Sequence, residues 1–234
     1  MSIISKKNLP VVRAATVQQD KGPKATGVAR RTSKSSVMMS LKNMIKQKVE
    51  INIENVVATT SLNQNINIKR TIRNFSAKYN PDKFPGAVIR LVNPRSVILI
   101  FKSGSIVCTG TKSEKMAEKA IQEFVSELNR TTKLENATFQ EIKIENIVAS
   151  CNLKNRIHLE QAARILPRSL YEPEQFPGII HRTCHPKTVL LLFASGRLVC
   201  TGAKSTQEVN SSVNAIHMEL EQMGLIVHDS DGLI

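Results

Sequence analysis

The chain has 234 residues, of which 41% are apolar and 22% are charged, and its formal net charge is +14. This length can bury one or two hydrophobic cores. No stretch approaches the ~18 consecutive apolar residues that a membrane-spanning helix needs, so the composition argues against a membrane protein.

Much of the positive charge lies in residues 1–49, which hold eleven Lys and Arg, including Lys6-Lys7 and Arg30-Arg31, against one Asp. Ser, Thr, Gln, Lys and Pro dominate residues 1–40, a composition typical of disorder. We therefore expect a basic, disordered N-terminal tail. Its charge fits a nucleic-acid-binding arm, and it fits equally a solvating tail with a nuclear-import signal.

The remainder of the chain is an internal duplication. Residues 103–113 return almost unchanged as residues 195–205, and the match extends back to Phe84-Pro85-Gly86 and Phe176-Pro177-Gly178. Two copies of this size are typical of two similar halves related by a pseudo-dyad and not of a solenoid. The predicted organisation is a first repeat with its linker at 50–140, a second repeat at 141–228 and a short C-terminal tail at 229–234.

Each repeat shows the same order of elements. After an opening strand, apolar spacing around Ile66–Phe75 predicts a short helix, and β-branched segments predict strands at 87–92, 96–101 and 105–109. A long amphipathic helix is expected over 114–130. The second repeat has the same pattern, and Ser205 with Glu208 predicts a capping box at its long helix. The fold class is therefore α+β, with helices on one face of an antiparallel sheet.

The predicted strand at 96–101 is apolar on both faces. Period-two alternation puts Val97, Leu99 and Phe101 on one side and Ile98 and Ile100 on the other. An antiparallel sheet covered by helices on one face should be polar on the other. Either both faces are buried, or one is an apolar binding surface, and the strand alone leaves both alternatives open.

Signals for catalysis or metal binding are weak. No Ser, His and Asp set and no carboxylate pair recurs in both repeats, and the glycine spacing differs from that of a phosphate-binding loop. The four cysteines have no Cys-x-x-Cys spacing, which is typical of free thiols in a reducing compartment. We expect no enzyme, no cofactor and no metal.

Taken together, the matched repeats and their Phe, Asn and Val-Cys-Thr-Gly motifs make residues 50–228 resemble the core of the TATA-box-binding protein family. The resemblance implies a pseudo-symmetric saddle whose curved antiparallel sheet has a concave DNA-binding face, with helices on the convex side. It also implies that the pairs Phe84 with Phe101 and Phe176 with Phe193 wedge between base steps. The positions assigned to the minor groove are Asn55, Val57, Phe84, Leu99, Phe101, Val107, Thr109, Asn146, Val148, Phe176, Leu191, Phe193, Val199 and Thr201.

These residue types suit the minor groove of A·T-rich DNA. A·T pairs show only acceptors there, whereas G·C pairs add a projecting donor, so a flat floor of Val and Thr fits A·T and clashes with G·C. Repeat-matched cations are the candidates for phosphate contacts, although each could equally be a plain solvated charge. These candidates are Arg90, Arg95, Lys112, Arg182, Lys187, Arg197 and Lys204.

The resemblance further implies a nuclear general transcription factor that bends A·T-rich promoter DNA and nucleates pre-initiation complexes. Its partners would be transcription factors IIA and IIB and polymerase-associated factors, with Glu172 and Glu174 in the loop that holds transcription factor IIB. Ser105 replaces a usual Lys and Gln175 a usual apolar residue, so the alternatives are a related paralogue with altered promoter choice or a protein-interaction scaffold. Without DNA, a second copy could cover the apolar face.

Overall fold

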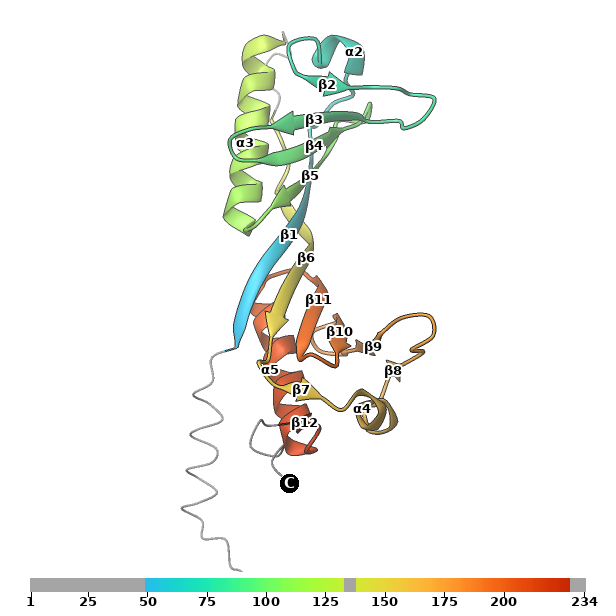
Figure 1. Ribbon diagram of the computed structural model, residues 1–234. Helices are drawn as coiled ribbons and strands as arrows, with labels where there is room; N and C mark the ends of the chain where they lie inside the picture. Colours follow the sequence, from blue (N-terminus) through green and yellow to red (C-terminus); the bar gives the residue numbers. More distant parts are fainter. Residues whose placement is uncertain (1–48, 133–137, 228–234) are drawn as a thin grey trace, which may run out of the picture. The chain divides into compact units, whose positions relative to one another are not determined.

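The structure is a computed structural model that describes residues 49–132 and 138–227 (Figure 1). The predicted tails, 1–49 and 229–234, lie outside these residues except for Val49. Both repeats fall within one compact unit. Among the described helices, none combines the length and the apolar character needed to cross a membrane.

The first repeat follows the predicted order of an opening strand, a short helix, further strands and a long helix. Its long helix begins after Ser113, whose Oγ accepts a hydrogen bond from the Met116 N–H at 3.2 Å and so caps the helix. The elements are β1 (Glu50–Ser61), α2 (Ile68–Thr71), β2 (Ala77–Lys78), β3 (Ala87–Leu91), β4 (Ser96–Ile100), β5 (Ser105–Thr111) and α3 (Glu114–Thr131).

The second repeat has the same core order and adds two short strands. Ser205 Oγ caps its long helix by accepting from the Glu208 N–H at 3.2 Å, while the Glu208 carboxylate accepts from the Lys204 N–H at 2.7 Å. The predicted capping box is thus present in a form that reaches back one residue further. The elements are β6 (Lys143–Asn152), β7 (Arg156–Ile157), α4 (Leu159–Ile165), β8 (Ser169–Leu170), β9 (Gly178–Arg182), β10 (Val189–Phe193), β11 (Arg197–Ala203), α5 (Thr206–Gln222) and β12 (Ile226–Val227).

One antiparallel sheet of ten strands runs through both repeats in the order β2-β3-β4-β5-β1-β6-β11-β10-β9-β8. The order is the same from either edge when each strand is exchanged for its repeat mate, so the pseudo-dyad passes between β1 and β6. The short strands β7 and β12 form a separate pair. The predicted α+β class with two repeats and a curved antiparallel sheet is confirmed (Figure 1).

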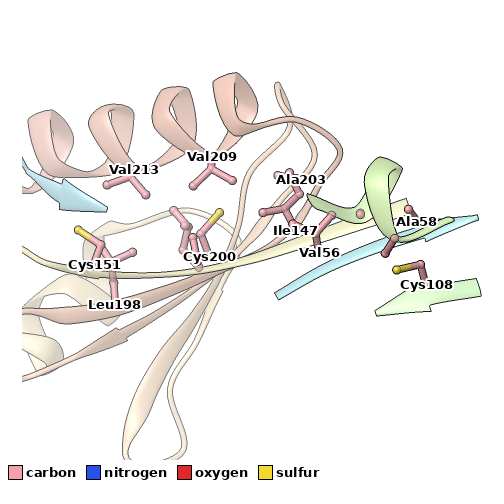
Figure 2. Packing of buried hydrophobic residues seen from close by; sticks show 14 of the residues in the cluster. Val56, Ala58, Cys108, Ile147, Cys151, Leu198, Cys200, Ala203, Val209 and Val213 are labelled. Carbon is pink, nitrogen blue, oxygen red and sulfur yellow. The ribbon is translucent and has the colours of Figure 1, made fainter. Parts of the chain in front are cut away.

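The hydrophobic core lies between the sheet and the long helices. Helix α3 packs on β1, β4 and β5, and α5 packs on β6 and β11. Figure 2 shows Val209 and Val213 of α5 directed at the sheet residues Ile147 and Cys200, and all four are fully buried. The apolar stripe of each long helix thereby covers one face of the sheet.

The sheet's two faces differ, which decides between the alternatives left by the sequence. On β4, Ile98 and Ile100 are fully buried beneath the helices, whereas Val97 and Leu99 on the opposite side remain partly exposed. The same alternation holds for Leu190 and Leu192 against their neighbours on β10. We call this second, partly exposed face the open face.

The predicted short helix of the first repeat is much shorter than its apolar pattern. Helix α2 spans only Ile68–Thr71, with Asn67 Oδ1 accepting from the Arg70 N–H at 3.1 Å as its cap. Phe75 lies beyond the helix and packs on Phe124 of α3, with ring centroids 5.3 Å apart. The apolar residues around this segment are therefore spaced by their contacts with the core, and only a single helical turn lies among them.

Candidate nucleic-acid interface

The centre of the open face lies where the two repeats meet. Strands β1 and β6 pair so that Asn55 lies opposite Val148 and Val57 lies opposite Asn146. All four side chains are partly exposed, while their neighbours Val56 and Ile147 are fully buried on the helix side. Two amides and two valines therefore form a compact, pseudo-symmetric centre.

Hydrogen bonds set the orientation of both central amides. Asn55 Oδ1 accepts from the Gly110 N–H at 2.8 Å and from Thr109 Oγ1 at 3.1 Å. Asn146 Oδ1 accepts from the Gly202 N–H at 2.7 Å. A backbone N–H can only donate, so the atom facing it must be the amide oxygen. Asn146 Nδ2 also donates to Thr201 Oγ1 at 3.3 Å, so its second N–H and the Asn55 NH₂ are the donors left for a ligand.

Apolar and hydroxyl side chains extend the open face on both sides of this centre. In the first repeat Leu99 lies opposite Val107, and Thr109 lies opposite Val97. The second repeat repeats the arrangement in its own pairs. The residues of this floor that the sequence assigned to the groove are Leu99, Val107 and Thr109 with Leu191, Val199 and Thr201.

An edge-to-face phenylalanine pair lies at each end of the floor. The rings of Phe84 and Phe101 are 5.7 Å apart at 64°, and those of Phe176 and Phe193 are 5.7 Å apart at 61°. Phe84 is 37% exposed. The two repeats therefore carry matching aromatic pairs, one at each end of the floor.

Glycines beneath the rings were not predicted as part of the site. A Cβ on Gly86 would lie 2.8 Å from Phe101 Cε1 and 2.9 Å from Phe84 Cε1. On Gly178 it would lie 2.9 Å from the Leu192 carbonyl oxygen. The sequence feature that could have identified these glycines is the Phe-Pro-Gly motif, which occurs in both halves.

The cationic candidates are all exposed, but they are not equivalent. Arg90 lies opposite Val97 and Arg182 opposite Val189, which puts both on the open face. Lys112 and Lys204 instead form ion pairs, 3.4 Å to Glu54 and 3.5 Å to Glu145. The others lie in loops or at a strand start: Arg95, Lys187 and Arg197.

Glu54 and Glu145 are repeat mates that sequence reasoning missed. Glu54 Oε1 accepts from Ser150 Oγ at 2.6 Å, and Glu145 Oε1 accepts from Thr59 Oγ1 at 2.9 Å. These hydroxyl bonds, followed by the nearby lysines, hold the pKa of both carboxyl groups below its usual range. Each carboxylate is thus bonded to the other repeat, a contact that sequence spacing cannot reveal.

The residues predicted to contact partners lie in the loop that leads to Phe176, outside the strands of the floor. Glu172 and Glu174 are exposed in the loop between β8 and β9, where the Glu172 carbonyl accepts from the Gln175 and Phe176 N–H groups at 2.9 Å. Ser105 lies at the start of β5, and its hydroxyl is 2.9 Å from Ser103 Oγ. The contacts of all these residues with DNA or protein stay predictions.

The fold and the site together define a class of protein. It is a two-repeat α+β protein whose sheet has one face covered by helices and one open apolar face bounded by paired phenylalanines. The family model described as "Transcription factor TFIID (or TATA-binding protein, TBP)" matches residues 50–131 and 141–223. The chain belongs to this family of transcription factors.

Curated relatives and a solved structure agree with this assignment. The TATA-box-binding protein of Pyrobaculum islandicum is 41% identical over 181 residues, covering 77% of this chain and 90% of the relative. That of Pyrodictium occultum is 44% identical over 180 residues, covering 76% and 90%. The structure of Methanococcus jannaschii TBP matches with a TM-score of 0.65 at 38% identity, covering 74% of this chain and 99% of that one.

Proposed function

We propose that this chain is a general transcription factor that binds the minor groove of A·T-rich promoter DNA through its open face. It bends the duplex there and nucleates a pre-initiation complex. The observation that carries the proposal is the pair of oriented amides, Asn55 and Asn146, at the centre of an apolar floor bounded by two phenylalanine pairs. The names of the relatives support it.

The centre of the floor suits A·T pairs. Adenine N3 and thymine O2 are acceptors, and they match the amide NH₂ donors left by the bonds to Gly110 and Gly202. Val57 and Val148 beside these amides offer no acceptor to the exocyclic amino group of guanine. A G·C pair at the centre would therefore lose packing and leave a buried donor unpaired.

The phenylalanine pairs suit the ends of a bent site. Burying one Phe contributes roughly 1.5–3 kcal/mol, and unstacking one base step costs a few kcal/mol, so each pair roughly offsets one kink. Net affinity then comes from the floor and from phosphate contacts by residues such as Arg90 and Arg182. Bending at two flexible steps beside an A·T-rich core is the expected geometry.

Partner binding belongs to the same proposal. Glu172 and Glu174 are exposed in the loop between β8 and β9, which the family resemblance assigns to transcription factor IIB, and their charge suits a basic partner surface. The proposed activity is non-catalytic: the protein presents bent DNA and its own surfaces to other factors.

Energy transfer between dyes at the two ends of a short TATA-containing duplex tests the proposal. The protein should raise the transfer, and a G·C-substituted duplex should show no rise. The double variant Phe84→Ala/Phe193→Ala should lose the rise, because one ring of each pair is gone. Ile165→Ala is the matched control, since it removes a half-exposed apolar side chain from α4.

Either of two results would overturn the proposal. Equal bending by wild type and the double variant would remove the wedge assignment. No rise on either duplex, together with binding that vanishes at moderate salt, would point to simple charge attraction and favour a protein-interaction scaffold.

A further inference from the structure

Two carboxylates are unexpected on a face proposed to receive a polyanion. Glu54 is the extra residue of an irregularity in the β1–β6 pairing, between Ile53 and Asn55, and its carboxylate bonds to Ser150. Glu145 precedes Asn146 in the same way and bonds to Thr59. Both therefore lie beside the central amides, where a carboxylate without a cation beside it would repel phosphates.

Each carboxylate also holds a lysine from its own repeat. Lys112 Nζ is 3.4 Å from Glu54 Oε2, and the two side chains are 69% and 45% exposed. Lys204 Nζ is 3.5 Å from Glu145 Oε2, with exposures of 64% and 42%. The geometry recurs in both halves, as does the local sequence, because each Glu precedes the central Asn and each Lys follows the Thr-Gly of the neighbouring strand.

Ion pairs this exposed are weak and exchange readily. Such pairs add little net stability, so a lysine can leave its carboxylate for a phosphate. The carboxylates compete with DNA phosphates for these lysines. The hydrogen bonds from the Ser150 and Thr59 hydroxyls favour the carboxylates, because these bonds fix the two side chains and keep them ionised. Each lysine must then be exchanged from one anion to another on binding DNA.

We propose that Glu54 and Glu145 are positioning residues that restrain Lys112 and Lys204 and so limit the share of DNA affinity that comes from phosphate contacts. This inference rests on the proposed function, because it concerns the same open face. An exchanged lysine gives a smaller net release of cations than a free one, because the carboxylate that it leaves takes up a cation while the phosphate loses one. A larger share of the DNA affinity then comes from the floor and the wedges, whose contacts depend on the base sequence.

The salt dependence of duplex binding tests this restraint. For B-DNA the slope of log K against log salt is about −0.9 for each phosphate neutralised. Glu54→Gln/Glu145→Gln should steepen the slope by up to about 1.8, and each freed lysine should add a roughly 3- to 4-fold loss of affinity between 50 and 200 mM salt. Gln keeps an acceptor for Ser150 and Thr59, so the fold should be preserved.

A double-mutant comparison separates restraint from a general charge effect. Lys112→Gln should change the slope little in the wild-type background and by about 0.9 in the Glu54→Gln background. Glu123→Gln is the control, because Glu123 pairs with Lys119 on α3 at 3.6 Å, away from the open face. That variant carries the same charge change and should leave the slope as in wild type.

The proposal is overturned if Lys112→Gln has the same effect in both backgrounds, or if Glu54→Gln/Glu145→Gln leaves the slope unchanged. The slopes are measured on the TATA duplex and on the G·C-substituted duplex. A protein that fails to discriminate between the duplexes contradicts the proposed function, yet its slopes still report whether the lysines are restrained. The two failures are therefore distinguishable.

Discussion

At the scale of single residues, the central amides combine a structural bond with a free donor. The oxygen of each is used by a glycine N–H in the neighbouring strand, at 2.8 Å for Asn55 and 2.7 Å for Asn146. The side chain is therefore ordered before any ligand arrives. This preorganisation lowers the entropy cost of presenting a donor to the groove.

Asn55→Asp separates these two roles. A carboxylate oxygen still accepts from Gly110 and Thr109, so stability should change little, but the NH₂ donor is lost and a negative charge faces the DNA. We expect duplex affinity to fall roughly 10- to 100-fold, because an unmatched buried polar group costs about 1–3 kcal/mol. Fluorescence anisotropy on the TATA duplex measures it.

Asn67→Asp is the control for that variant. Asn67 also accepts from a backbone N–H, at 3.1 Å from Arg70, but it caps α2 and is not on the floor. The same charge change there should leave affinity near that of wild type. Equal losses for Asn55→Asp and Asn67→Asp would mean that net charge, and not the groove donor, is responsible.

The two glycines beneath the phenylalanines should not tolerate a methyl group equally. At Gly86 the near atoms, 2.8 and 2.9 Å away, belong to rings that can shift, whereas at Gly178 the Leu192 carbonyl oxygen lies 2.9 Å away on a paired strand. Gly178→Ala should lower the free energy of unfolding by about 1–3 kcal/mol through overpacking, and Gly86→Ala by less. Urea unfolding of both variants decides it, and equal losses would contradict the asymmetry.

At the scale of elements, the sequence predicted what periodicity and capping specify. Helix α3 begins at Glu114 as expected and ends at Thr131, one residue beyond the prediction, because its apolar spacing and the Ser113 cap agree. The strands β3 to β5 begin where they were predicted. The two-residue strands β2, β7, β8 and β12 went unnoticed, since so short a segment has no alternation to detect.

The candidate site divides in the same way. The family resemblance, which is carried by motifs that recur in both repeats, assigns the wedge and floor positions, and the structure brings them to one face. Glu54 and Glu145 recur as well, but the hydrogen bonds that position their carboxylates come from Ser150 and Thr59 of the opposite repeat. Contacts across a pseudo-dyad are set by strand register, which residue spacing within one repeat does not encode.

The strand pair β8–β9 carries a polar contact that its repeat mate lacks. Ser169 lies opposite His181, whose Nδ1 is 3.0 Å from Ser169 Oγ, whereas the first repeat has Ala77 opposite Ile89. Burial is the largest cause and lowers the pKa of His181; the negative charge of Glu219 opposes this lowering, and the positive charge of Arg168 adds a smaller one. The folded protein therefore favours neutral His181.

This lowered pKa predicts a loss of stability in mild acid. Above the ordinary histidine pKa of about 6.5 the contribution is fully present, and it is lost as pH falls below that value, because the unfolded chain binds the proton more readily. Ser169→Ala/His181→Ile copies the first repeat and should flatten the decline between pH 7 and pH 5. Urea unfolding across that range measures it, and an unchanged decline in the variant would contradict the assignment.

At the scale of the whole molecule, the repeats are joined on both faces of the sheet. On the helix side, Glu114 Oε1 at the start of α3 accepts from the Thr206 N–H at 2.7 Å and from its hydroxyl at 2.8 Å, at the start of α5. On the open face, Glu54 and Glu145 each bond to the other repeat. With β1 and β6 paired between them, we expect the two repeats to unfold as one cooperative unit.

The cysteines can test this cooperativity. Cys108, Cys151 and Cys200 lie on β5, β6 and β11, and burial raises their pKa to about 11, 12 and 11, so at pH 8 they should react with iodoacetamide only when the sheet opens. Cys184 is exposed and should react at once, which makes it an internal standard. In mild urea, mass spectrometry of labelled peptides should give the three buried thiols one common rate. Faster labelling of Cys108 than of Cys200, or the reverse, would show that one repeat opens alone and that the bonds across the pseudo-dyad do not couple the halves.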